Sequence, residues 1–111
     1  MKAICVDDER ILAKDIAEMC LELPEIDDVK SFFRARDALS WLKEHPADLA
    51  LLDINMPDMN GITLATEMKA MYPDIAVIFL TAYTKYAVEA FAVRAAGYLM
   101  KPVTKEALAA D

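Results

Sequence analysis

Hydrophobic residues are arranged in two patterns that alternate along the chain: short continuous runs and longer segments with helical spacing. Continuous runs are typical of strands covered on both faces, and helical spacing indicates amphipathic helices. Their alternation predicts an α/β fold with a parallel sheet. We expect strands near residues 3–6, 28–33, 48–52, 75–80 and 97–100, and helices near 9–22, 35–44, 61–72, 84–95 and 104–110.

The segment at 28–33 mixes polar and apolar residues, which favours a strand at the edge of the sheet. Proline follows three of the helical stretches and is expected to end each of them, at Pro24, Pro46 and Pro73. Asn60-Gly61 is a turn signal that opens the third helix.

The fourth helical segment, 84–95, is apolar on two sides. One stripe consists of Ala87, Phe91 and Ala95, and the other consists of Tyr86, Ala90 and Val93. A helix of this kind is either buried on both sides or offers a surface to a partner. We expect the first stripe to pack on the sheet and the second to face a partner. In the alternative, Tyr86 lies flat on the surface with its hydroxyl in water.

Composition narrows the possible functions. A chain of 111 residues supports one domain. The net charge of −7 argues against direct binding of nucleic acid or of a membrane surface, because Lys and Arg supply that affinity. No apolar run approaches the roughly 18 residues of a membrane span, and the apolar N-terminal run is too short for a signal peptide. We expect a cytoplasmic protein.

Cys5 and Cys20 lie in the expected first strand and first helix. Their spacing matches no common metal site. We expect two reduced thiols that serve as apolar core residues in the cytoplasm.

Polar groups suited to metal and phosphate chemistry follow four of the apolar runs. Asp7 and Asp8 follow the first, Asp53 ends the third, and Thr81 and Lys101 follow the fourth and fifth. Because the carboxyl ends of parallel strands lie side by side and bind ligands, we expect these groups to converge.

Three converging carboxylates repel one another, and a hard cation such as Mg²⁺ relieves that repulsion. One carboxylate, Asp53, could then attack phosphorus and form an aspartyl phosphate. The Thr81 hydroxyl and the Lys101 ammonium are groups that commonly bind phosphoryl oxygens.

Each residue also has a simpler interpretation. Lys101 could be an exposed lysine at a strand end, and Thr81 could cap the following helix. The run 7–9 could stabilise a helix N-terminus without metal. A carboxylate that closes a buried strand, as Asp53 does, is costly without a purpose.

Over its whole length the chain resembles a bacterial response-regulator receiver domain. The matching motifs are Val6-Asp7-Asp8-Glu9, Leu52-Asp53-Ile54-Asn55-Met56-Pro57-Asp58-Met59-Asn60-Gly61, Leu80-Thr81-Ala82 and Leu99-Met100-Lys101-Pro102. The resemblance implies a flavodoxin-like, doubly wound (βα)5 fold with strand order 2-1-3-4-5. It also implies a signalling domain of a two-component system that catalyses only its own phosphoryl transfer and autodephosphorylation.

By position, the resemblance implies that Asp53 accepts a phosphoryl group from a histidine kinase. Asp8 binds Mg²⁺ directly, Asp7 binds it mostly through water, and the backbone carbonyl of Asn55 is a further ligand.

In the same family pattern, Thr81 and Lys101 bind the phosphoryl oxygens, and Lys101-Pro102 is a cis peptide. Tyr98 matches an aromatic residue that swings inward when Thr81 moves towards phosphate. Asn55 and Tyr83 match positions that tune the lifetime of the aspartyl phosphate.

The segments 85–91 and 97–103 resemble receivers attached to LytTR-type or bacterial transcriptional activator DNA-binding domains. The last helix, from residue 104 to 111, makes only about two turns, fewer than is usual in the family. We therefore expect residues 1–111 to be a receiver cut from a longer regulator with a C-terminal output domain. Tyr86, Ala90, Val93 and Tyr98 are expected to contact that domain or a second copy of the chain.

Three other classes fit less well. A haloacid-dehalogenase-like phosphatase carries its nucleophile after the first strand and a second acid two residues later, where this chain has Asn55 after Asp53. A flavodoxin-like cofactor binder needs a glycine-rich first turn, whereas residues 7–10 are Asp-Asp-Glu-Arg. A phosphate-independent protein-binding scaffold with the receiver fold is the third possibility.

Overall fold

A computed structural model describes residues 1–110, in which strands and helices alternate strictly. The strands are β1 (Lys2–Val6), β2 (Asp28–Phe32), β3 (Leu49–Asp53), β4 (Ala76–Thr81) and β5 (Gly97–Met100). The helices are α1 (Arg10–Leu21), α2 (Ala35–Leu42), α3 (Gly61–Met71), α4 (Ala87–Ala92) and α5 (Lys105–Ala110). The predicted order of elements is confirmed.

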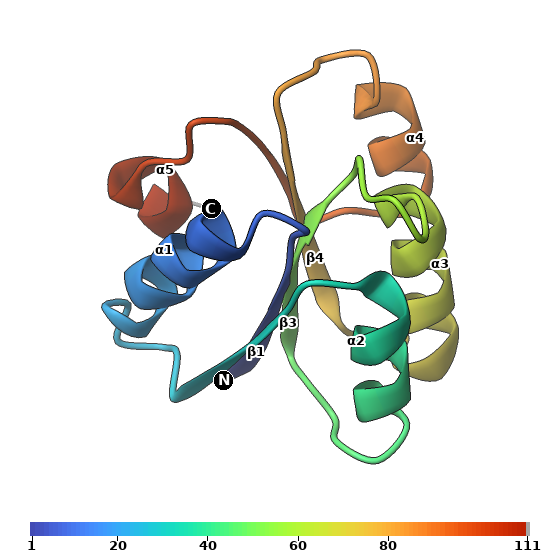
Figure 1. The fold of residues 1–111 in the computed structure, drawn as a ribbon, viewed down its shortest axis with the longest axis horizontal. Coiled ribbons are helices and arrows are strands. Elements are labelled where there is room, and N and C mark those ends of the chain that lie inside the picture. The colour runs from blue at the N-terminus through green and yellow to red at the C-terminus, as the bar shows by residue number, and fades with distance from the viewer. Residues whose placement is uncertain (111) are drawn as a thin grey trace.

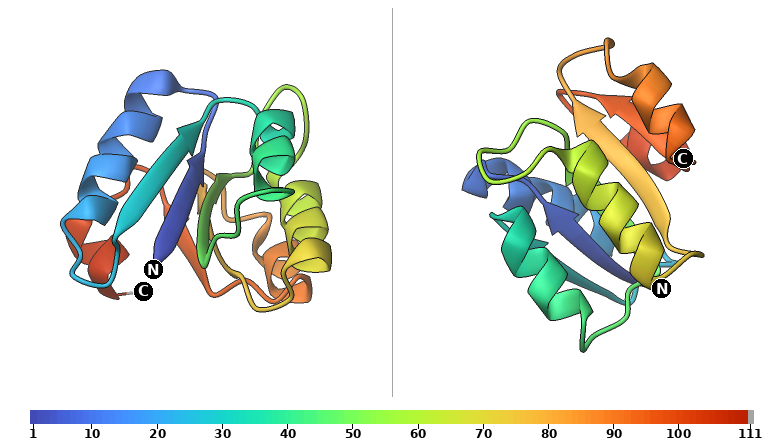
Figure 2. Two further views of the ribbon diagram at one scale, coloured as in Figure 1. Left: turned by 90° about the horizontal axis from the view of Figure 1, so that it is seen from below. Right: turned by 90° about the vertical axis from the view of Figure 1, so that its right-hand side faces the viewer.

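The strands form one parallel sheet in the order β2-β1-β3-β4-β5, as predicted (Figure 2). β2 lies at one edge, in agreement with its mixed sequence. The register pairs Asp53 with Leu80, and Thr81 with Met100. It therefore aligns the carboxyl ends of neighbouring strands and brings the polar residues that follow them to one side of the sheet.

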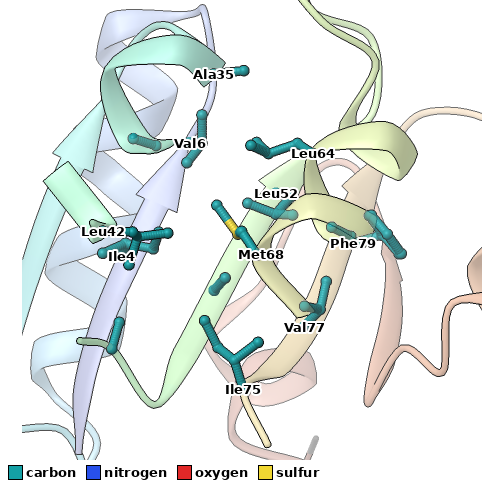
Figure 3. Close-up of a cluster of buried hydrophobic side chains, with 14 of the residues drawn as sticks. Ile4, Val6, Ala35, Leu42, Leu52, Leu64, Met68, Ile75, Val77 and Phe79 are labelled. Carbon is teal, nitrogen blue, oxygen red and sulfur yellow. The ribbon is translucent and has the colours of Figure 1, made fainter. Parts of the chain in front are cut away.

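Helices cover both faces of the sheet (Figure 1). α1 and α5 lie on one face, and α2, α3 and α4 lie on the other. On the second face, side chains from β1, β3 and β4 pack against α2 and α3. The strands contribute Ile4, Leu52 and Phe79, and the helices contribute Leu42 and Met68 (Figure 3). The central strands are thus buried on both sides, which explains their continuous apolar runs.

Both cysteines belong to the core on the α1 side and form no disulfide within residues 1–110. Burial raises the pKa of the Cys20 thiol to about 11, and it also raises the pKa of Cys5. The prediction that both are buried core thiols is confirmed. Across the described residues, no helix is long and apolar enough to cross a membrane.

The prediction of which side of the fourth helix faces the sheet is wrong. Ala90, on the stripe assigned to a partner, is 3% exposed, and Tyr86 and Val93 pack against the core with it. The outward side carries Phe91, which is 84% exposed, and Val88, which is 79% exposed. The two stripes are similar in size and polarity, so tertiary packing rather than local sequence decides which of them faces the sheet.

α4 is also shorter than the predicted span of 84–95. Residues 84–86 form a turn, in which the Ala87 N–H donates to the Thr84 carbonyl at 3.2 Å. At the other end Arg94 has a φ of 58°, and the Ala95 N–H donates to the Ala90 carbonyl at 3.1 Å. A left-handed residue with this bonding ends a helix, although glycine usually occupies the position.

Candidate functional site

Three carboxylates meet beyond the carboxyl ends of β1 and β3. Oxygens of Asp7, Asp8 and Asp53 all lie within 4.8 Å of one another. Asp7 is fully buried and Asp53 is 4% exposed, whereas Asp8 is open to solvent. The fold therefore brings together the acidic residues that the sequence predicted would converge.

Lys101 reaches this cluster from the end of β5. Its Nζ lies 3.1 Å from Asp7 Oδ2, 3.4 Å from Asp53 Oδ1 and 4.0 Å from Glu9 Oε1. The Lys101-Pro102 peptide is cis, and the Lys101 N–H donates to the Thr81 carbonyl at 2.8 Å. The interpretation of Lys101 as an isolated surface lysine is thus wrong.

The charges are unequally matched, because one ammonium faces three carboxylates. Burial, together with the charge of Asp7, raises the pKa of Asp53 to about 6, although Lys101 acts in the opposite direction. Burial would lower the pKa of Lys101, but Asp53 and Asp7 outweigh it and raise that pKa. Lys101 therefore remains charged at neutral pH, while Asp53 is held in an environment that disfavours its ionised form.

The cluster fits a small, hard cation. Asp7 Oδ1 accepts a hydrogen bond from the Glu9 N–H at 3.0 Å, and the buried Oδ2 pairs with the Lys101 ammonium at 3.1 Å. One ammonium does not balance the carboxylates of Asp7, Asp8 and Asp53, and a cation ligated by their oxygens would offset the remaining repulsion. Helix capping does not explain the run 7–9, since Glu9 is the N-cap of α1 and makes no capping side-chain hydrogen bond within the described residues.

Thr81 is the last residue of β4 and is 1% exposed, so it is not the cap of α4. Its Oγ1 accepts a hydrogen bond from the Tyr83 N–H at 3.2 Å. The Tyr83 carbonyl in turn accepts a hydrogen bond from the Tyr98 hydroxyl. Two hydrogen bonds thus connect the Thr81 hydroxyl at the end of β4 to the Tyr98 ring on β5.

The loop after β3 is shaped by Gly61. Its N–H donates to the Ile54 carbonyl at 2.8 Å, which closes the loop. A Cβ at this position would lie 2.2 Å from the Asp53 carbonyl oxygen, so only glycine allows α3 to begin so close to Asp53. Asn60 caps the helix by accepting from the Ile62 N–H at 2.7 Å, as the turn signal suggested.

Comparison with known proteins agrees with this geometry. The family model described as "Response regulator receiver domain" matches residues 3–111. The chain belongs to the response-regulator receiver family. The family predicted from the sequence is confirmed.

Individual relatives support the same assignment. A response regulatory protein of Vibrio cholerae is 37% identical over 108 residues, covering 96% of this chain and 41% of that protein. Transcriptional regulatory protein LytR of Staphylococcus aureus is 32% identical over 102 residues, covering 92% of this chain and 42% of that protein. The receiver thus spans less than half the length of these relatives.

A solved structure shares the receiver fold. The response regulatory domain of protein mrkE from Klebsiella pneumoniae superposes with a TM-score of 0.90 at 30% identity. The match covers 99% of this chain and 90% of that one.

Three contacts around the receiver site were not foreseen from the sequence. Glu9 lies near Lys101, Asp58 bonds to the start of α2, and the Tyr86 hydroxyl bonds to Asn55. The run Asp7-Asp8-Glu9 was a usable signal for the first of these. The other two join segments that are distant in sequence, and no local pattern marks them.

Proposed function

We propose that this receiver is a phosphorylation-operated switch in which Asp53 accepts a phosphoryl group from the phosphohistidine of a histidine kinase. An Asp53 carboxylate oxygen bonds to phosphorus, the P–N bond breaks, and the released imidazole takes up a proton. The observation that carries the proposal is the convergence of Asp53 with Asp7, Asp8 and Lys101 at the strand ends. Beyond this transfer and the later hydrolysis of its own aspartyl phosphate, the domain has no enzymatic role.

Asp7, Asp8, Asp53 and the backbone carbonyl of Asn55 would hold Mg²⁺. When bound, the ion neutralises the carboxylates and the charge that develops on the phosphoryl group during transfer. The excess of carboxylates over the Lys101 ammonium and the all-oxygen donor set support this assignment.

Lys101 and Thr81 bind the phosphoryl oxygens of the product. Lys101 already lies 3.4 Å from Asp53 and keeps its charge, because the neighbouring carboxylates raise its pKa. Thr81 contributes a hydroxyl donor. Catalysis of this kind depends mostly on positioning and charge.

The phosphoryl group changes the conformation through the contacts that begin at Thr81. When the Thr81 hydroxyl moves onto a phosphoryl oxygen, it breaks its bond from the Tyr83 N–H, and the Tyr83 carbonyl held by Tyr98 shifts with it. Tyr98 and α4 then reposition. A ligand must favour one state by about 5.5 kcal/mol to reverse a 99:1 population.

The switched surface acts on a C-terminal output domain, a DNA-binding one of the LytTR or transcriptional activator type, and through it on transcription in the cytoplasm. The similarity to transcriptional regulatory protein LytR, and the greater length of the relatives, support this step. The exposed Val88 and Phe91 of α4, together with Tyr98, provide the contact for the output domain or for a homodimer. The acidic chain does not bind DNA itself.

Intact-mass measurement after incubation with Mg²⁺ and acetyl phosphate tests the proposal. We expect one phosphoryl adduct on the native chain, none on Asp53→Asn, and none when Mg²⁺ is chelated. Absence of an adduct on the native chain, together with absence of beryllofluoride binding, would contradict the switch and favour a phosphate-independent scaffold.

A further inference from the structure

A groove runs between α2 and α3, which lie side by side on one face of the sheet (Figure 2). It has a volume of about 540 Å³. Its apolar lining comes from Leu39 on α2 and from Ala70 and Met71 on α3, and all three keep part of their surface open to solvent. An apolar strip between two helices is the kind of surface onto which an amphipathic helix docks.

The two sides of the groove carry opposite charges. Arg36 in α2 and Lys43 at its C-cap line one side, seven residues or about 10.5 Å apart along the helix. Glu67 of α3 lines the other side. Because the whole chain has a net charge of −7, this excess of positive charge is a local exception. A helix that fits the groove has carboxylates along one edge of its apolar side chains and a cation along the other.

The outer side of α1 has this complementary pattern. Ile11, Asp15 and Glu18 lie four and three residues apart, so they form one stripe along the helix. Lys14 and Leu21, seven residues apart, form a second stripe beside it. All five side chains are exposed, Ile11 by 80% and Leu21 by 52%. α1 therefore presents two exposed apolar residues with carboxylates along one edge and an ammonium along the other.

We propose that the groove between α2 and α3 takes α1 of a second copy of this chain. The apolar residues of α1 lie over the apolar strip, its carboxylates face Arg36 and Lys43, and Lys14 faces Glu67. Opposite charges on both edges fix the register of the helix in the groove and disfavour other orientations. A contact between one helix and one groove is small, so the association is weak and transient.

The two surfaces lie on opposite faces of the sheet, α1 on one and α2 with α3 on the other (Figure 1). A copy whose α1 occupies a neighbour's groove therefore leaves its own groove open to a third copy. The contact is head to tail and does not close into a two-fold dimer. At physiological ionic strength the screening length is about 8 Å, which weakens the repulsion between whole chains more than the attraction between charges in contact. Such association does not require phosphorylation of Asp53.

Sedimentation velocity of the native chain from micromolar to millimolar concentration, at physiological ionic strength, tests the contact. We expect the average mass to rise with concentration beyond that of a dimer. Lys43→Glu alters the groove and Glu18→Lys alters α1, and each should weaken association roughly tenfold or more, because each brings like charges together. The two changes shift the net charge by two units in opposite directions, so an effect of net charge alone would not weaken both. Lys85→Glu, at an exposed lysine outside both surfaces, is the matched control and should associate like the native chain.

An equimolar mixture of Lys43→Glu and Glu18→Lys should associate again, because the altered groove of one fits the altered α1 of the other. Recovery on mixing also shows that both variants are folded. A native chain that stays monomeric at millimolar concentration would overturn the inference and leave the groove to an acidic helix of another protein. Association that stops at a dimer, or that neither substitution weakens, would overturn it as well.

Discussion

The carboxylate of Asp58, in the loop after β3, accepts a hydrogen bond from the backbone N–H of Ala35 at 3.2 Å. The same carboxylate accepts from the Arg36 N–H at 3.1 Å. Arg34, the N-cap residue of α2, makes no side-chain capping bond within residues 1–110. A residue 23 positions later therefore caps α2, and the loop that carries Asn55 is anchored to a second helix.

Replacing Asp58 with alanine should lower the free energy of unfolding by about 1 kcal/mol, the usual value of a helix cap. Asp58→Asn, which keeps one acceptor oxygen, should cost less. Urea denaturation at pH 7 measures both. If the alanine variant were as stable as the native chain, the cap would make no net contribution.

The effect of Asp58 should depend on pH. Burial would raise its pKa, but the N–H groups of Arg36 and Ala35 outweigh burial and lower it below the ordinary 3.8. A lowered pKa in the folded state means that the stabilisation is present above pH 3.8 and is lost as the pH falls through the folded value. The native chain and Asp58→Ala should therefore converge in stability at acidic pH.

Asp53→Asn should be more stable than the native chain at pH 7 without Mg²⁺, by on the order of 2 kcal/mol. The pKa of Asp53 is raised to about 6, so its stabilising, neutral form is fully present below pH 3.8 and is lost as the pH rises through 6. Thermal unfolding from pH 4 to 8 should show the difference growing with pH. Saturating Mg²⁺ should reduce it by stabilising only the native chain, and a difference independent of both pH and Mg²⁺ would argue against this electrostatic origin.

Gly61→Ala should destabilise the fold by roughly 3 kcal/mol, because the added Cβ would meet the backbone carbonyl oxygen of Asp53. Relief requires the start of α3 to move away from the loop, so beryllofluoride binding should weaken as well. Chemical denaturation and a beryllofluoride titration by tryptophan fluorescence measure the two effects. Native-like values in both would show that the loop yields easily.

Arg94→Gly should stabilise the chain by about 1 kcal/mol, because Arg94 has a φ of 58° that glycine adopts without strain. Ala92→Gly, two residues earlier at the last position of α4, is the matched control and should destabilise by a similar amount. Both changes are read from urea denaturation midpoints. Stabilisation by both substitutions, or by neither, would contradict the assigned backbone geometry.

The site was readable from the sequence because its signals are local. Asp7 and Asp53 each come directly at the end of an apolar run, and parallel pairing makes the ends of such strands coincide. The strand order came with the family resemblance. Lys101 was placed in the same way, by its position after a strand and before a proline.

The structural features that could not be predicted from the sequence depend on contacts between distant residues. The phase of α4 is set by how Ala90 packs against the sheet, and the competing stripe through Phe91 is equally apolar. Asp58 caps α2, a helix that precedes it in the chain and is separated from it by β3 and the loops on either side of that strand. Arg94 occupies a backbone conformation that its side chain gives no reason to expect.

The ion pair between Lys101 and Asp7 connects the end of β5, the last strand in the sequence, to the end of β1, the first, across β3 and β4. During synthesis the three carboxylates emerge from the ribosome well before the lysine that balances them. A nascent or half-folded chain without a docked β5 therefore holds the carboxylates of Asp7 and Asp53 without the Lys101 counter-charge. If Asp53 takes up phosphate as proposed, that ability requires the whole domain to be assembled, and incompletely folded copies would not signal.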